Sequence, residues 1–202
     1  MKIFKPDKKS FELLINEKPK KIIICSPWIS TEGVKMLTET ILSRDLSEME
    51  CLEIWFRVTT DDFIFNRTDY QGLLDFCQQI VKSCGLSILS LRQDEKLHAK
   101  FYQCDNSYYI GSANLTLNGF GKNIEIMLED NVNHHEILIG IMNLREKLSL
   151  LSLLQIKNFI KMCQHEDIIK LKNEAKKFNE NVRNIKIPPT SHKIPPHFRI
   201  PW

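Results

Sequence analysis

The chain has 202 residues, of which 43% are hydrophobic, so it is long enough to bury a core in one compact domain with an appendage. Its formal net charge of +3 excludes a strongly basic nucleic-acid-binding composition, so any phosphate-binding charge must be local. The six cysteines form no CxxC pair, which argues against a zinc site or a disulfide framework.

Neither a signal peptide nor a transmembrane segment is predicted. The first residues carry a charge every few positions. The Leu- and Ile-rich stretch 137–154 is interrupted by Arg145, Glu146 and Lys147, which is not typical of a membrane span. We therefore expect a cytoplasmic protein with no membrane partner.

The first half of the chain predicts alternating strands and helices. Residues 20–27 form a short apolar run ended by proline, the pattern of a strand buried on both faces. Ser30 or Thr31 can cap the helix that follows. A second strand over 51–59, a helix over 70–82 and a third strand over 85–91 come next. This β-α-β-α-β order indicates an α/β sheet with helices packed on it.

The second half predicts two strands over 97–105 and 108–111, joined by a tight turn at Asn106-Ser107. A further strand is expected over 123–129, and a helical pattern begins at His134. The fold class that follows is α/β, with a mixed, largely parallel central sheet flanked by helices. We expect three segments, which are a catalytic domain over 1–165, a polar helix over 166–186 and a Pro-rich tail over 187–202.

The Pro-rich tail cannot continue a helix and favours extended, polyproline-like chain. Two interpretations remain open for it. It is either a loosely held terminus or an arm that docks on a second subunit or on a protein partner.

The most informative residues lie between 97 and 125. His98 and Lys100 are two positions apart on a predicted strand, so both side chains leave the same face, where an imidazole and an ammonium suit a phosphate. Such a pair alone is weak evidence. It is followed, however, at set spacing by Asp105, Gly111, Ser112 and Asn114. Chance agreement at so many positions is rare.

This pattern resembles the HKD motif of the phospholipase D superfamily, and the preceding elements, with Ser26–Ile29 after the first strand, resemble the first half of that fold. The resemblance implies that His98 attacks phosphorus to form a phosphohistidine, while a second histidine protonates the leaving oxygen. It also implies that Lys100 and Asn114 hold the non-bridging oxygens with help from Ser112, and that Glu125 orients the imidazole.

The chain departs from that family in the hairpin, because five residues separate Asp105 from Gly111 where the family usually has six. In an unbroken ladder with a two-residue turn, Asn114 would lie on the wrong face for Lys100. The strand must therefore end or bulge near Gly111, or the assignment of Asn114 fails. We expect structural roles for Asp105 and Gly111.

Only one histidine of the chain is followed by lysine two residues later. Because the chemistry needs two histidines, the resemblance implies a homodimer in which both copies of His98 meet at one phosphate. We expect no metal and no cofactor, since the sequence offers no carboxylate cluster. The nearest pair, Asp61-Asp62, is more typical of a solvated loop or a helix cap.

The small single-motif architecture resembles bacterial phospholipase D-type nucleases and the catalytic domains of metal-independent restriction endonucleases. We therefore expect a metal-independent nuclease, acting on DNA rather than RNA. The residues expected to contact substrate are Ser26, Trp28, Arg57 and Lys122, with Arg67 and Arg92 as further candidates for the phosphate backbone. Two alternatives remain open: a phospholipase or phosphatidyl transferase, and a non-catalytic nucleic-acid-binding or scaffolding subunit of a restriction or defence complex.

Overall fold

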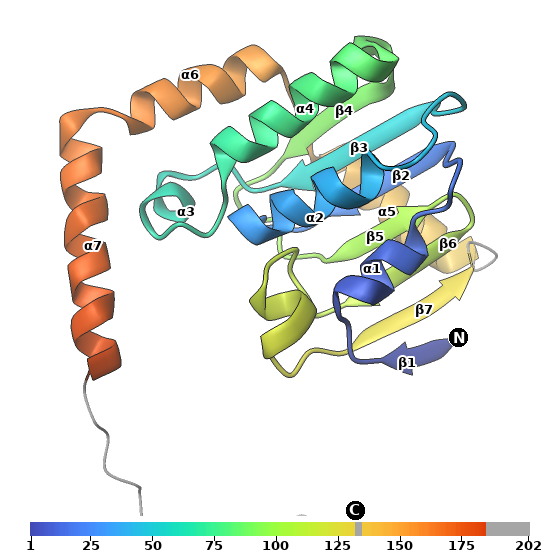
Figure 1. Cartoon of the computed structure of the whole chain (residues 1–202), viewed down its shortest axis with the longest axis horizontal. Coiled ribbons are helices and arrows are strands. Elements are labelled where there is room, and N and C mark those ends of the chain that lie inside the picture. Colours follow the sequence, from blue (N-terminus) through green and yellow to red (C-terminus); the bar gives the residue numbers. More distant parts are fainter. Residues whose placement is uncertain (132–134, 185–202) are drawn as a thin grey trace, which may run out of the picture.

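A computed structural model describes residues 1–131 and 135–184 (Figure 1). The Pro-rich segment 187–202 and the helix start expected at His134 lie outside these residues. The described strands form one eight-stranded sheet in the order β1-β7-β6-β5-β2-β3-β4-β8. Their bounds are β1 Lys2–Phe4, β2 Lys21–Cys25, β3 Cys51–Phe56, β4 Leu89–Gln93, β5 Phe101–Cys104, β6 Ser107–Gly111, β7 Met127–Asn131 and β8 Ser149–Leu151.

Helices flank this sheet, as the sequence predicts. Their bounds are α1 Lys8–Leu14, α2 Thr31–Ile41, α3 Thr60–Ile64, α4 Tyr70–Cys84, α5 His135–Lys147, α6 Leu153–Cys163 and α7 Glu166–Asn184, with short helical turns η1 Leu86–Ile88 and η2 Asn118–Lys122. Ser30 caps α2, since its hydroxyl accepts from the Gly33 amide. Among the described residues, no helix is long and apolar enough to cross a bilayer.

The sheet is mixed, but the expectation that it is largely parallel is wrong. Parallel pairing is confined to β2 with β3 and β3 with β4. The pairs β2–β5, β5–β6, β6–β7, β1–β7 and β4–β8 are all antiparallel. The reason is connectivity: only the first part of the chain places helices between neighbouring strands, and such crossovers are what parallel pairing requires.

The core has two layers, one on each face of the sheet, and β2 contributes to both. Ile22 and Ile24 lie in the larger layer, which α1, α2, α4 and α6 cover. Ile23 and Cys25 lie in the smaller layer against Trp55, and α5 covers that face (Figure 1). The strand predicted to be buried on both faces is therefore confirmed. All six cysteines are free thiols.

Several boundaries differ from those that the sequence predicts. The hairpin turn is Asp105-Asn106, because Cys104 pairs with Ser107, and Asp105 adopts a left-handed φ of 49°. The third strand starts at Leu89, after η1. The strand expected over 123–129 is β7, shifted to Met127–Asn131. The strand expected from 97 begins at Phe101, so His98 and Lys100 lie in the segment that leads into β5.

Candidate functional site

The His98 and Lys100 side chains lie together at the start of β5. Lys100 Nζ is 3.1 Å from His98 Nδ1 and donates a 2.7 Å hydrogen bond to the His98 carbonyl. The imidazole is exposed, whereas Lys100 is buried. Burial lowers the pKa of Lys100, and the nearby Glu125 carboxylate acts in the opposite direction. The exposed imidazole of His98 and the partly desolvated ammonium of Lys100 therefore lie close enough together to contact the same group of a ligand.

The contact with Lys100 determines which imidazole nitrogen carries a proton. A charged ammonium can only donate, so Nδ1 accepts and the proton of a neutral ring lies on Nε2. A neutral ring in this state is a very weak acid, so a histidine that protonates a leaving oxygen must carry protons on both ring nitrogens. For Nε2 to attack phosphorus it must carry a lone pair, so Lys100 must first leave Nδ1.

Ser112 and Glu125 form a second pair. The Ser112 hydroxyl donates a short hydrogen bond to the Glu125 carboxylate and accepts one of 3.1 Å from the Ile126 amide. Asn123 Nδ2 donates to the other carboxylate oxygen at 3.3 Å. Among the described residues, no hydrogen bond joins Glu125 to His98. The Glu125 carboxylate is held by Ser112 and Asn123 instead, and its expected role in orienting the imidazole stays a prediction.

β6 ends at Gly111, as the assignment of Asn114 requires. A Cβ at this position would lie 2.2 Å from the Ile126 carbonyl oxygen, so only glycine allows this approach of the two chain segments. The chain then leaves the ladder, and Leu115 forms an isolated bridge with Ile29. Because the chain leaves the ladder here, Asn114 lines a cavity, and its buried Oδ1 has no hydrogen-bond partner.

That cavity has a volume of about 560 Å³. Asn114 and Glu125 line one part of it, and the loops that follow β2 and α3 line another. Trp28 lines it from the β2 side, and Phe65 and Arg67 line it from the α3 side. The α7 helix adds polar side chains, among them Lys176. His98 and Lys100 do not line this cavity. Glu125 connects the cavity with these two residues, because it lines the cavity and its negative charge raises the pKa of Lys100.

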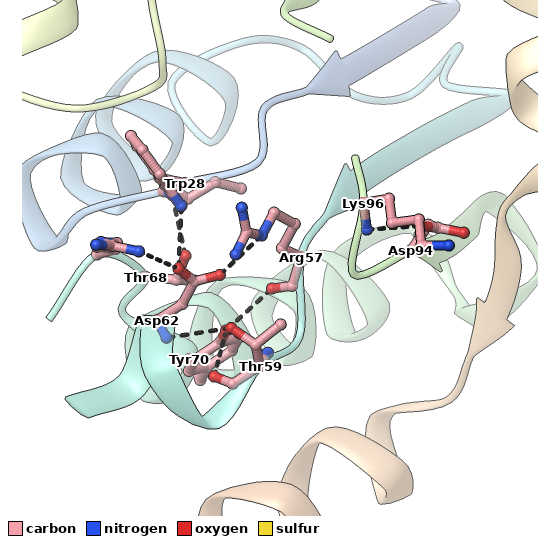
Figure 2. A network of polar contacts seen from close by, with 10 residues as sticks. Trp28, Arg57, Thr59, Asp62, Thr68, Tyr70, Asp94 and Lys96 are labelled. Atoms are coloured by element: carbon pink, nitrogen blue, oxygen red, sulfur yellow. Dashed lines mark hydrogen bonds and ion pairs between the residues drawn. The ribbon is translucent and has the colours of Figure 1, made fainter. Parts of the chain in front are cut away.

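A fully buried carboxylate, Asp62, holds the loops beside this cavity (Figure 2). Trp28 donates its indole N–H to Asp62 Oδ1 at 3.0 Å. Arg57 Nε lies 3.1 Å from Oδ2, and an Arg67 nitrogen lies 3.5 Å from Oδ1. We call these four residues the Asp62 cluster. The interpretation of Asp61-Asp62 as a solvated loop or cap is wrong for Asp62, because Thr59 caps α3.

No protein-family model and no curated protein matches this sequence. Solved structures do resemble the chain. Phosphatidylserine synthase from Haemophilus influenzae aligns with a TM-score of 0.56 and 14% identity over 87% of this chain. The alignment spans 42% of that protein, so this chain corresponds to less than half of it. The chain has a phospholipase D-like fold.

Two further solved structures also align with the chain. The phospholipase D family member Nuc from Salmonella typhimurium gives a TM-score of 0.49, with 15% identity over 71% of this chain and 90% of Nuc. NucT from Helicobacter pylori gives a TM-score of 0.43, with 14% identity over 71% of this chain and 89% of NucT.

Within this phospholipase D-like fold, the residues predicted to contact substrate differ in whether they are buried, line the cavity or are exposed away from it. Ser26 is fully buried, and its hydroxyl bonds to the Trp28 carbonyl and the Leu115 amide, so its expected substrate contact is wrong. Trp28 lines the cavity, whereas Arg57 is largely buried behind it in the Asp62 cluster. Lys122 is exposed at the end of η2 and does not line the cavity.

Asp105 and Arg92 have contacts away from the cavity. The Asp105 carboxylate accepts from the amides of Lys20 and Lys21 at 3.0 and 2.9 Å, which ties the hairpin to the start of β2. Arg92 lies 3.4 Å from the buried Glu53 carboxylate. Its expected role in tracking a phosphate backbone is therefore wrong.

Phe65 lines the cavity, although the sequence does not predict it as a site residue. The sequence predicts Arg67 only as a candidate contact of the phosphate backbone. Its guanidinium carbon is 5.1 Å from the ring centroid of Trp28 and also 5.1 Å from that of Phe65. The available signal is the spacing of Arg57 and Arg67, each five residues from Asp62. This spacing alone does not predict that both arginines pair with Asp62, because the pairing depends on the conformation of the loop.

Proposed function

We propose that this chain is a phosphodiesterase that cleaves nucleic acid at a site completed by a second copy of itself. The observation that carries the proposal is the exposed His98 imidazole in contact with the buried Lys100 ammonium. The Gly111-Ser112-Ala113-Asn114 turn that follows β6 supports it, because it brings Glu125 and Asn114 to the same end of the sheet.

In the proposed reaction, His98 Nε2 forms a bond to phosphorus while the bond from phosphorus to the leaving oxygen breaks. The second copy's histidine, as an imidazolium protonated on both ring nitrogens, donates one proton to that oxygen and becomes a neutral imidazole. Water then attacks the phosphohistidine, its proton passes to the second imidazole, and the phosphorus–nitrogen bond breaks. Lys100 holds a non-bridging oxygen and stabilises its developing charge.

Lys100 also sets the state of the nucleophile. A phosphate oxygen is a stronger partner for the ammonium than a neutral ring nitrogen, because both groups are charged. Substrate binding therefore draws Lys100 Nζ away from Nδ1, and the ring can move its proton to Nδ1 and expose the Nε2 lone pair. This sequence of events makes the imidazole reactive only after a phosphate is bound.

The second copy is proposed to pack on an apolar surface beside the catalytic turn. Ile110, Ile124 and Ile126 are exposed there. The pairing of Gly111 with Met127 and the bond from the Ser112 amide to the Ile126 carbonyl place these isoleucines next to the turn. Exposed apolar side chains grouped beside a functional segment are typical of an interaction site.

The character of the cavity favours nucleic acid over a phospholipid. Its lining combines asparagines, three glutamates, an arginine and a lysine with two aromatic rings and only two aliphatic side chains, so it offers no extended apolar channel for acyl chains. Phosphate contacts by cations and contacts of bases with aromatic rings are the two interactions that bind single strands. We propose DNA as the preferred nucleic acid.

The proposal is tested by digestion of a panel of labelled DNA, RNA and phosphatidylserine vesicles in excess chelator. We expect cleavage of nucleic acid, and loss of at least about a hundredfold in rate for His98→Ala, since the nucleophile is removed. His165→Ala is the matched control, because His165 is exposed near the start of α7. Equal loss in both variants, or turnover of the vesicles alone, would contradict the nuclease proposal.

A further inference from the structure

We infer that the cavity beside Asn114 receives an unstacked nucleobase, so that the substrate is single-stranded nucleic acid or a single-stranded region of it. This inference rests on the proposed function and adds the form of the substrate. The residues that carry it are Trp28, Phe65 and Arg67, which we call the stacking surface.

The stacking surface combines two aromatic rings with one planar cation. The Arg67 guanidinium carbon lies 5.1 Å from both ring centroids, and all three side chains line the cavity. Phe65 is 44% exposed and the Arg67 side chain 41% exposed, so both remain available to a ligand. Aromatic rings and guanidinium planes are the groups on which single-stranded bases stack.

The loop behind this surface is held in place before any ligand binds. The buried Asp62 carboxylate accepts the Trp28 indole N–H and pairs with Arg57 and Arg67. Between Phe65 and Arg67, Asn66 adopts a φ of 51°, a left-handed conformation that asparagine tolerates better than most residues. A surface that is already ordered loses less conformational entropy when it binds a base.

The stacking surface shares its cavity with groups of the proposed phosphodiester site. Asn114 and Glu125 line the same cavity, and the charge of Glu125 acts on Lys100. The buried Asn114 Oδ1 lacks a partner, and a base amino group can donate to it. A base held on the stacking surface therefore belongs to a nucleotide adjacent to the phosphate that is cleaved.

A duplex does not offer such a base. Its bases are already stacked and paired, so one of them must be extruded before it can reach the cavity. A single strand needs no such step. The net charge of +3 adds little general attraction to the duplex backbone. The stacking surface therefore selects single strands.

The experiment measures the binding of a fluorescent oligonucleotide and of its blunt duplex by anisotropy, in a His98→Ala background that prevents cleavage. We expect the single strand to bind at least about fivefold more tightly than the duplex. Phe65→Ala in the same background lowers single-strand affinity about fivefold and leaves the weaker duplex affinity nearly unchanged. The matched control is Phe178→Ala, since Phe178 is a 66% exposed phenylalanine of α7 and is not part of the cavity lining.

Two kinds of result overturn the inference, and they are distinguishable. Equal affinity for both forms, or equal effects of Phe65→Ala and Phe178→Ala, removes the stacking surface while cleavage of nucleic acid by the unmodified protein still stands. Binding of neither form, together with an absence of cleavage, overturns the proposed function itself.

Discussion

Two buried carboxylates in this molecule have nearly the same set of partners. Asp62 pairs with Trp28, Arg57 and Arg67, and Glu53 pairs with Trp55, Arg92 and Arg145. We call the second group the Glu53 cluster. In each, one indole N–H and two guanidinium groups compensate a carboxylate that is removed from water, because an uncompensated buried charge is very costly.

The two clusters differ in how completely their arginines are engaged. In the Glu53 cluster, Arg145 Nε lies 2.9 Å from each carboxylate oxygen, and Arg92 also donates to the Arg145 and Leu148 carbonyls. These contacts fix α5 against the sheet. In the Asp62 cluster, Arg67 makes one contact of 3.5 Å with the carboxylate, and its side chain also lines the cavity. Similar chemistry thus fixes a helix in one place and presents a cation in the other.

The largest effect that the comparison predicts is on stability. Arg145→Met leaves the buried Glu53 carboxylate undercompensated, and we expect the free energy of unfolding to fall by about 3 kcal/mol, the lower end for a broken buried pair because Arg145 is partly exposed. Urea unfolding measures this. The control is Lys147→Met on the same helix, which should change stability by less than about 0.5 kcal/mol. Similar losses in both variants would mean that the Glu53 cluster does not hold α5.

The second prediction concerns pH. Burial raises the pKa of Glu53, but hydrogen bonds from Arg145 and Trp55 and the charges of both arginines outweigh it, so the net pKa is below the ordinary value of 4.5. A depressed carboxyl pKa contributes stability that is present above pH 4.5 and is lost as the pH falls through the lowered pKa. The stability difference between the unmodified protein and Glu53→Gln should therefore shrink below pH 4.5.

Urea unfolding of both proteins between pH 7 and about pH 3 checks this expectation. The comparison with Glu53→Gln is needed because other carboxyl groups, such as Asp45, also have a lowered pKa and contribute to acid unfolding. A difference that stays constant over this range would show that the Glu53 pKa is the same in the folded and unfolded states.

The central strands and the edge strands differ in how far the sequence could predict them. β2 is apolar after Lys21 and β3 is apolar except for Glu53, so the burial of their apolar residues follows from that pattern alone. The edge strands β1 and β8 have three residues each, too few for any periodicity, and their pairing partners lie far away in the sequence. The turn at Asp105 shifted by one residue because asparagine and aspartate both tolerate left-handed backbone.

The candidate site also has contacts that the local sequence predicts and contacts that depend on the fold. The approach of His98 and Lys100 follows from a separation of two residues in extended chain, which is a local property. The partners of Glu125 depend on how the segment between Ser112 and Ile126 folds back on itself. The burial of Asp62 depends on Trp28, which is thirty-four residues away, and no local pattern encodes such a contact.

The smallest effect on stability is predicted for Arg67→Gln, and it separates the two clusters most clearly. Because Arg67 makes a single ion pair of 3.5 Å, whereas the equally exposed Arg145 contacts Glu53 at 2.8 and 2.9 Å, we expect the free energy of unfolding to change by less than about 1 kcal/mol. The affinity for a single-stranded oligonucleotide should nevertheless fall about fivefold, since the cation between two aromatic rings is lost. Urea unfolding and anisotropy on the same preparation measure both quantities. If Arg67→Gln instead destabilised the protein as strongly as Arg145→Met, both clusters would serve only to hold the fold together, and the cavity would have no prepared cation for a ligand.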